Sequence, residues 1–287
     1  MITVCSTDGA ELALHELGGD PQGRPLLFCH ATGFHGRVWR AVADEFPERR
    51  NLALDFRGYG DSTEQDGVLR WEGFADDVLS VVDSLALDEV QAVGHSKGGA
   101  ALLLAEIARP GTFERLACFE PIVFPPMGEG GAIGPGDAPE NPLAAGARRR
   151  REHFDSYEDA IERFAAKKPL GLLRADVLED YVRHGFQPDA DGGITLKARR
   201  EHEAATYDSG SLHHAYEQLD QIACPVLVLH GGDGGFPAMA APMIATALMA
   251  GDVRAMPELG HFGPLEDPVA FATEVRGFLT AGADGGA

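Results

Sequence analysis

Short, continuously apolar segments recur along this chain, and most of them are followed by a segment with helical spacing. They cover residues 26–30 (LLFCH), 51–56 (NLALDF), 90–95 (VQAVGH), 115–124 (RLACFEPIVF) and 224–231 (CPVLVLHG). Segments of this length and composition are typical of strands that are buried on both faces. When such strands alternate with helices, they form a parallel sheet that helices cover on both sides. The chain is therefore predicted to adopt an α/β fold around a mostly parallel central sheet.

The spacing of apolar residues in the segments between these strands agrees with this fold. Residues 71–87 place Phe74, Val78 and Val81 on one helical stripe, with acidic residues on the opposite face. Residues 97–109 and 268–280 also predict helices, and residues 2–17 predict a hairpin with its turn at residues 7–10.

Residues 125–220 break the alternation of strands and helices. This segment begins with a Pro/Gly-rich stretch and continues with charged helical patterns at 147–168, 175–184, 198–207 and 212–219. We expect a helical cap, or lid, inserted into a core formed by residues 1–124 and 221–287. The four arginines at 148–151 could grip an anionic substrate, but a solvated face balanced by nearby acidic residues is the preferred interpretation.

Composition limits the partners. The chain has 287 residues and a formal net charge of -21, so phosphate backbones and anionic lipids are repelled. We expect no nucleic acid or membrane partner and a small-molecule substrate; the sequence carries no signal for the oligomeric state. Residues 1–10 contain no apolar run, and the four cysteines lack the paired spacing of a zinc site. These features predict a reduced, cytoplasmic protein without a metal.

Residues 93–100 (VGHSKGGA) place Ser96 between Gly94 and Gly98, in the pattern G-x-S-x-G. This pattern is found at a sharp strand-to-helix turn, where small neighbours let the serine hydroxyl project toward a substrate. An apolar run precedes Ser96 and a helical pattern follows it, and the N-terminus of a helix favours developing negative charge. Ser96 is therefore a candidate nucleophile.

Four motifs together make the chain resemble the α/β-hydrolase superfamily. They are LLFCHATGFHGRVW at 26–39, LDFRGYGDS at 54–62, GHSKG at 94–98 and LGHFGPLEDP at 259–268. The resemblance covers nearly the whole chain and implies the α/β-hydrolase fold, with no metal or organic cofactor. Haloalkane dehalogenases and epoxide hydrolases also resemble this chain, but they have an aspartate at the strand-to-helix turn (the nucleophile elbow) where this chain has Ser96.

The resemblance also implies roles for individual residues. Ser96 would be the nucleophile and His261 the general base. The backbone N–H groups of Thr32 and Lys97 would form the oxyanion hole, although Ala31 replaces a glycine that is common in the family. The Lys97 side chain has two possible settings: contact with a carboxylate of the substrate or of the cap, or a place away from the pocket.

The acidic partner of His261 has two candidates. Most of the superfamily carries it as the fourth residue of a G-x-x-D loop, where this chain has Gly234, with Asp233 one position earlier. A minority, including haloalkane dehalogenases and zearalenone lactonases, carries it at the end of the strand after the elbow helix. Glu120 lies there, and a carboxylate in so apolar a strand needs a partner such as a histidine that becomes cationic. Glu120 is the preferred acid and Asp233 the alternative.

The expected activity is hydrolysis of a small ester, lactone or thioester through an acyl-enzyme on Ser96. Phe34, Phe124, Met127 and Phe236 are candidates for an apolar substrate pocket or for ordinary packing. Two other activities fit the same residues: carbon–carbon bond hydrolysis and cofactor-free perhydrolysis. A hydrolase-fold protein that binds a small ligand without catalysis is the alternative from another class.

Overall fold

The structure is a computed structural model that describes residues 1–63, 69–126, 141–210 and 212–281. The strands of the central sheet are β1 (Ile2–Cys5), β2 (Glu11–Gly19), β3 (Pro25–Cys29), β4 (Arg50–Leu54), β5 (Val90–His95), β6 (Phe113–Phe119), β10 (Val226–Gly231) and β11 (Gly251–Met256). The helices that accompany them are η1 (Gly36–Trp39), α1 (Arg40–Ala43), α2 (Trp71–Ser84), α3 (Lys97–Ala108), α8 (Phe236–Ala247), α9 (Gly263–Glu266) and α10 (Pro268–Thr280).

The central sheet has eight strands in the order β1-β2-β4-β3-β5-β6-β10-β11. β2 pairs antiparallel with β1 and with β4, and every other neighbouring pair in this sheet is parallel. The predicted mostly parallel sheet is therefore confirmed, and so is the hairpin at the start of the chain. Parallel pairing brings the carboxyl ends of β3, β5, β6 and β10 to one edge, where binding sites of open α/β sheets lie.

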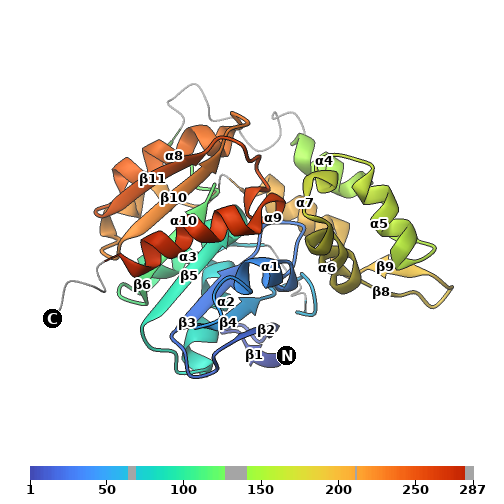
Figure 1. The fold of residues 1–287 in the computed structure, drawn as a ribbon, viewed down its shortest axis with the longest axis horizontal. Helices are drawn as coiled ribbons and strands as arrows, with labels where there is room; N and C mark the ends of the chain where they lie inside the picture. The colour runs from blue at the N-terminus through green and yellow to red at the C-terminus, as the bar shows by residue number, and fades with distance from the viewer. Residues whose placement is uncertain (64–68, 127–140, 211, 282–287) are drawn as a thin grey trace.

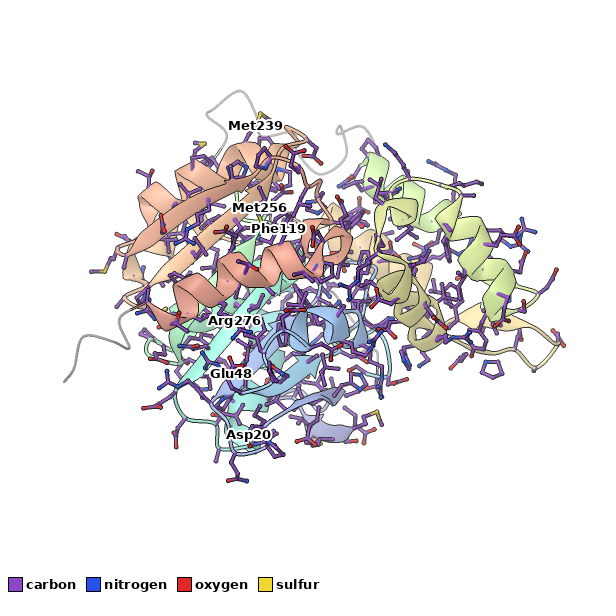
Figure 2. The ribbon with its side chains drawn as sticks, in the orientation of Figure 1. Asp20, Glu48, Phe119, Met239, Met256 and Arg276 are labelled. Carbon is purple, nitrogen blue, oxygen red and sulfur yellow. The ribbon has the colours of Figure 1, made fainter. Side chains whose placement is uncertain are left out.

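Side chains of each inner strand alternate between two apolar cores, one on either face of the sheet. Leu27 and Cys29 of β3 face the core that includes α2, α3 and α8, whereas Leu26 and Phe28 face the core that includes α1 and α10. Figure 1 shows α10 in front of the sheet, and Figure 2 shows Phe119 of β6 in the interior behind it. Helices thus cover both faces, as the alternating pattern predicts.

Residues between β6 and β10 form the inserted segment, which Figure 1 shows on one side of the molecule. Its elements are α4 (Pro142–Arg149), β7 (His153–Phe154), α5 (Tyr157–Ala165), η2 (Leu170–Leu172), α6 (Ala175–Gly185), β8 (Phe186–Pro188), β9 (Ile194–Leu196), α7 (Arg200–Asp208) and η3 (Tyr216–Gln221). The short strands form a separate antiparallel sheet in the order β7-β9-β8. The prediction of one helical pattern over 147–168 is wrong, because β7 separates α4 from α5.

The end of the inserted segment packs on the core. Ala215 and Leu219 of the η3 region belong to the same apolar cluster as β6 and α3. His213 Nε2 donates a hydrogen bond of 2.7 Å to the Ile122 carbonyl, just beyond β6. Among the residues that the structure describes, no helix has the length and apolar character needed to cross a membrane.

Candidate active site

Ser96 occupies the turn between β5 and α3. Its backbone has φ 54° and ψ -113°, a strained conformation for a residue with a side chain. The turn is fixed at both ends, because the Ser96 N–H donates to the Phe119 carbonyl (2.9 Å) and the Ser96 carbonyl accepts from the Ile122 N–H (3.2 Å). The residue is 6% exposed, so the hydroxyl sits in a recess and not on the outer surface.

Glycines make this turn possible by allowing close backbone approach. A Cβ on Gly94 would lie 2.6 Å from the Gly99 nitrogen, and one on Gly98 would lie 2.1 Å from the Cys29 carbonyl oxygen. Neither contact is sterically possible, so β3, β5 and α3 meet at this distance only because these positions lack side chains.

Glu120 and His261 are in direct contact. Glu120 Oε2 lies 2.5 Å from His261 Nδ1, and Glu120 Oε1 accepts the Gly231 N–H at 2.8 Å. β6 ends at Phe119, five residues before the end of the predicted strand segment 115–124, and Glu120 has a φ of 44°. Both oxygens of this fully buried carboxylate are therefore satisfied, as burial of a charge requires.

Asp233 lies close to His261 but contacts its backbone. Asp233 Oδ2 accepts the His261 N–H at 3.1 Å, and Oδ1 accepts the Gly235 N–H at 3.0 Å. The loop after β10 packs tightly on the histidine loop, since a Cβ on Gly232 would lie 2.2 Å from the Pro257 carbonyl oxygen. In this arrangement the carboxylate of Asp233 holds the histidine loop, whereas that of Glu120 holds the imidazole.

Two further residues hold His261 in place. His95 Nε2 donates to the His261 carbonyl at 2.8 Å, and the two imidazole rings lie 5.1 Å apart. Glu266 Oε2 accepts the Gly260 N–H at 3.0 Å. The backbone on both sides of His261 is thus anchored before any substrate arrives, a form of preorganisation that catalysis requires.

Of the two predicted oxyanion donors, Lys97 directly follows Ser96 in the chain and Thr32 lines the same cavity. Lys97 is the first residue of α3, so its backbone N–H has no acceptor within the helix. Thr32 follows β3 and lines the same cavity as Ser96 and His261. His30 fixes the loop that carries Thr32, because its Nε2 accepts the Phe56 N–H at 3.1 Å while Nδ1 donates to the Ala31 carbonyl at 2.8 Å.

The Lys97 side chain points away from this site into the core. Its Nζ is buried without a hydrogen-bond partner among the described residues and lies over the rings of Phe56 (4.4 Å), Tyr59 (3.6 Å) and Phe74 (4.8 Å). Burial lowers the pKa of Lys97 well below its ordinary value, and Asp77 opposes this effect only in part. Of the two settings considered for this side chain, the structure has the one away from the pocket.

We expect Lys97→Met to stabilise the fold by about 1–2 kcal/mol at pH 7, because it removes a buried amine to which no described residue gives a hydrogen bond. The lowered pKa means that Lys97 binds more protons in the unfolded chain than in the folded one, so its unfavourable contribution to stability shrinks as the pH rises to about 10. The advantage of the variant should therefore shrink from pH 7 to pH 9.5. Urea unfolding at both pH values measures it; a pH-independent difference, or a less stable variant, contradicts the assignment.

A cavity of about 400 Å³ opens at Ser96 and His261. Its apolar walls come from the core and from α4 of the inserted segment: Trp71, Ile122, Phe124, Leu143, Phe236 and Pro237. Its polar walls are Thr32, Asn141, Thr206, Tyr207 and Asp208. Several of these residues, above all Trp71 and the Thr206–Asp208 run at the end of α7, carry no motif that the sequence could have revealed.

Most polar groups in the walls of the cavity already form hydrogen bonds within the protein. Trp71 Nε1 donates to Ser209 Oγ at 3.2 Å, and Thr206 Oγ1 hydrogen-bonds the Tyr59 hydroxyl at 2.9 Å. Asn141 uses its amide on the Tyr207 carbonyl (2.9 Å), and Asp208 accepts from Arg148 (2.7 Å). The groups that remain to meet a ligand are thus chiefly apolar.

The four residues predicted to line an apolar pocket do not all lie at the cavity. Phe124 and Phe236 line the cavity, with their ring centroids 4.7 Å apart. Phe34 is not among the cavity residues that the structure describes. It is 5% exposed and packs between Tyr181 (5.1 Å) and Phe262 (5.2 Å), directly after the turn at Thr32–Gly33 that the Phe34 N–H closes on the Ala31 carbonyl. Met127 lies outside the described residues.

Metal-ligating side chains gather away from the cavity. Within the described ranges, one group of histidine and carboxylate side chains has suitable spacing, namely His15, Asp55 and Asp61. Its central carboxylate is already occupied: Asp55 accepts the Gly36 N–H (2.6 Å), the Asp61 N–H (2.8 Å) and His15 Nε2 (2.8 Å). Burial raises the pKa of Asp55, but the hydrogen bond to His15 and the charges of His15, His35 and His30 together lower it overall. These contacts favour a structural role in the loop after β4.

Known proteins share this architecture. A model described as the alpha/beta hydrolase family matches residues 26–274. The chain is 27% identical over 239 residues to non-heme chloroperoxidase CPO-A1 of Kitasatospora aureofaciens (80% of each chain). It is 28% identical over 210 residues to pimeloyl-[acyl-carrier protein] methyl ester esterase of Cronobacter sakazakii (69% of this chain, 75% of that one). The solved structure of E-2-(acetamidomethylene)succinate hydrolase matches with a TM-score of 0.82 at 21% identity, over 98% of both chains.

Proposed function

Because the chain belongs to the alpha/beta hydrolase family, we propose that it is a serine hydrolase that cleaves small, uncharged esters, lactones or thioesters with an apolar acyl or aryl group. The observation that carries the proposal is the shared cavity: Ser96 and His261 both line it, and Glu120 contacts Nδ1 of the His261 imidazole. A serine, a histidine and a carboxylate that orients the histidine are the three groups that activate a serine hydroxyl.

In the first step, Ser96 Oγ attacks the carbonyl carbon while His261 Nε2 takes the hydroxyl proton. Glu120 keeps the other proton on Nδ1 and stabilises the imidazolium that forms. The carbonyl oxygen becomes an oxyanion, which the N–H groups of Thr32 and Lys97 stabilise. When the intermediate collapses, the C–O or C–S bond breaks and His261 returns its proton to the leaving group.

In the second step, water replaces the alcohol or thiol. His261 removes a proton from the water as its oxygen attacks the acyl carbon, and a second oxyanion forms in the same place. Collapse of this intermediate releases the carboxylic acid and restores the Ser96 hydroxyl. The histidine therefore acts as base and acid in turn, and its anchored backbone keeps the imidazole in one position for both proton transfers.

Charge points to an uncharged substrate. No lysine or arginine is among the cavity residues that the structure describes, and residues 127–140 contain none. A substrate carboxylate would lie unpaired against apolar walls, in a protein with a net charge of -21. An uncharged acyl chain meets no such penalty and gains from burial of its apolar surface.

We also propose that the inserted segment is the cap of this site. α4 and α7 bring Leu143, Thr206 and Tyr207 to the cavity that holds Ser96. Their contribution excludes water and sets the shape of the acyl pocket, so substrate selectivity resides largely in this segment.

Two esters with the same leaving group test the substrate class. We expect kcat/KM for p-nitrophenyl butyrate to exceed that for the p-nitrophenyl monoester of succinate by about 100-fold or more, because one carboxylate is then buried without a partner. Raising the ionic strength separates two causes of this difference in kcat/KM. If the difference comes from long-range repulsion, screening by salt makes it smaller; if it comes from desolvation of the carboxylate, it stays the same. Equal values for the two esters would overturn the substrate class and leave the serine mechanism intact.

A further inference from the structure

A buried ion pair of the inserted segment lies against the loop that carries Thr32. Arg150, directly after α4, hydrogen-bonds Glu203 of α7 through Nη1 and the Tyr181 hydroxyl through Nη2 (2.5 Å). Glu203 is 6% exposed, and the Arg150 side chain is 16% exposed. The sequence-based expectation of a solvated arginine face is therefore wrong for Arg150, which reaches into the interior.

The Arg150–Glu203 ion pair contacts this loop at Gly33, the residue after Thr32. Gly33 has a φ of 82°, and a Cβ placed on it would lie 2.9 Å from Glu203 Oε1 and 3.7 Å from Arg150 Nη1. The carboxylate thus packs directly on the backbone of the loop, one residue from the N–H group assigned to the oxyanion hole.

The same pair also supports the next residue of the loop. Tyr181, which hydrogen-bonds Arg150, packs its ring on Phe34 with a centroid distance of 5.1 Å. Phe34 in turn packs on Phe262, the neighbour of His261. Arg150 is therefore linked to both sides of the cavity, through Gly33 to Thr32 and through Phe34 to the histidine loop.

A carboxylate in this position has an electrostatic consequence. The reaction builds negative charge beside the Thr32 N–H, and an unneutralised Glu203 would repel that charge through a region with little water. Arg150 cancels the charge of Glu203 and holds its carboxylate in place. We propose that Arg150 is a positioning residue that lets the inserted segment complete the oxyanion hole by neutralising Glu203 against the Thr32–Phe34 loop. This inference rests on the proposed serine mechanism.

Charge-changing variants distinguish this role from a purely structural one. Arg150→Met leaves Glu203 negative, and we expect kcat for p-nitrophenyl butyrate to fall about 30-fold, the order of magnitude expected when one nearby unit charge repels the oxyanion in an effective dielectric of about 20. Glu203→Gln leaves no negative charge, so kcat should fall less than about 3-fold. The double variant Arg150→Met/Glu203→Gln should recover most of the loss of Arg150→Met. Loss of packing alone predicts the opposite order, with the double variant as the slowest.

Binding measurements add a second readout. A boronic acid that forms a tetrahedral anion on Ser96 should lose affinity in Arg150→Met by the same factor as kcat, while KM for the neutral ester changes less than about 3-fold. Arg183→Met is the matched control, because it removes an exposed arginine–glutamate pair (Arg183–Glu179, 2.7 Å) from α6 of the same segment. This control should keep kcat and boronate affinity within about 2-fold.

The outcomes separate the inference from the function on which it rests. If Ser96→Ala retains turnover, the serine mechanism fails and these variants no longer address the oxyanion hole. If Ser96→Ala is inactive but the double variant is no faster than Arg150→Met, the inference is overturned and the mechanism stands. Thermal unfolding of each variant identifies loss of fold, and Glu203→Gln, which keeps the shape of the side chain, supplies the comparison if Arg150→Met does not fold.

Discussion

Ser96→Ala is expected to lower kcat for p-nitrophenyl butyrate by about 10⁴-fold or more, because the variant lacks the hydroxyl that attacks the ester carbonyl. The fold should persist, since alanine removes one oxygen and the turn is held by backbone hydrogen bonds to Phe119 and Ile122. Initial rates at saturating ester measure the loss, and circular dichroism confirms the fold.

A loss confined to KM would contradict this account, because it would assign Ser96 to binding and not to bond formation. Ser80→Ala is a suitable control. It removes the hydroxyl of another buried serine, on α2, which is not among the described cavity residues. That variant should keep kcat within about 2-fold.

Glu120→Gln is expected to lower kcat by about 10²–10⁴-fold, and Asp233→Asn by less than about 10-fold. Glutamine keeps the shape of Glu120 but carries no charge, so it can neither fix the correct histidine tautomer nor stabilise the imidazolium. Asparagine at 233 retains an oxygen that can accept the His261 backbone N–H, so the histidine loop should keep its place.

The measurement is kcat for each variant with one ester, at a pH where the wild-type rate is constant. The reverse order, with Asp233→Asn the more damaging, would show that Asp233 supplies the acid. Equal and small effects would show that His261 needs no carboxylate partner for this reaction.

The central sheet could be predicted from the sequence because each inner strand is short, apolar and bounded by polar turns. Helix α8 left no comparable signal. Residues 236–247 are apolar almost throughout and contain two prolines, so they show no amphipathic stripe of the kind that identified α2. The separate sheet of β7, β8 and β9 was missed for another reason: strands of two or three residues are too short to show alternation.

Ser96, His261, Glu120 and Asp233 could be identified from the sequence because each stands in a short motif or at a strand end whose neighbouring residues are recognisable. The geometry around them depends on the fold. Glu120 reaches His261 across 141 residues of chain because β6 ends at Phe119 beside the loop after β10. The walls of the cavity are equally non-local: Thr206 and Tyr207 come from α7, where nothing in the sequence ties them to the elbow.

Covalent labelling of Ser96 tests the central claim most directly. The folded protein is incubated with a fluorophosphonate, in which Ser96 Oγ displaces fluoride from phosphorus, and the modified peptide is identified by mass spectrometry. We predict one adduct, on Ser96, that is absent from Ser96→Ala and forms about 100-fold more slowly in Glu120→Gln. Folded wild-type protein that remains unlabelled, or that carries the label elsewhere, would contradict the serine mechanism and favour a hydrolase-fold protein that binds a ligand without catalysis.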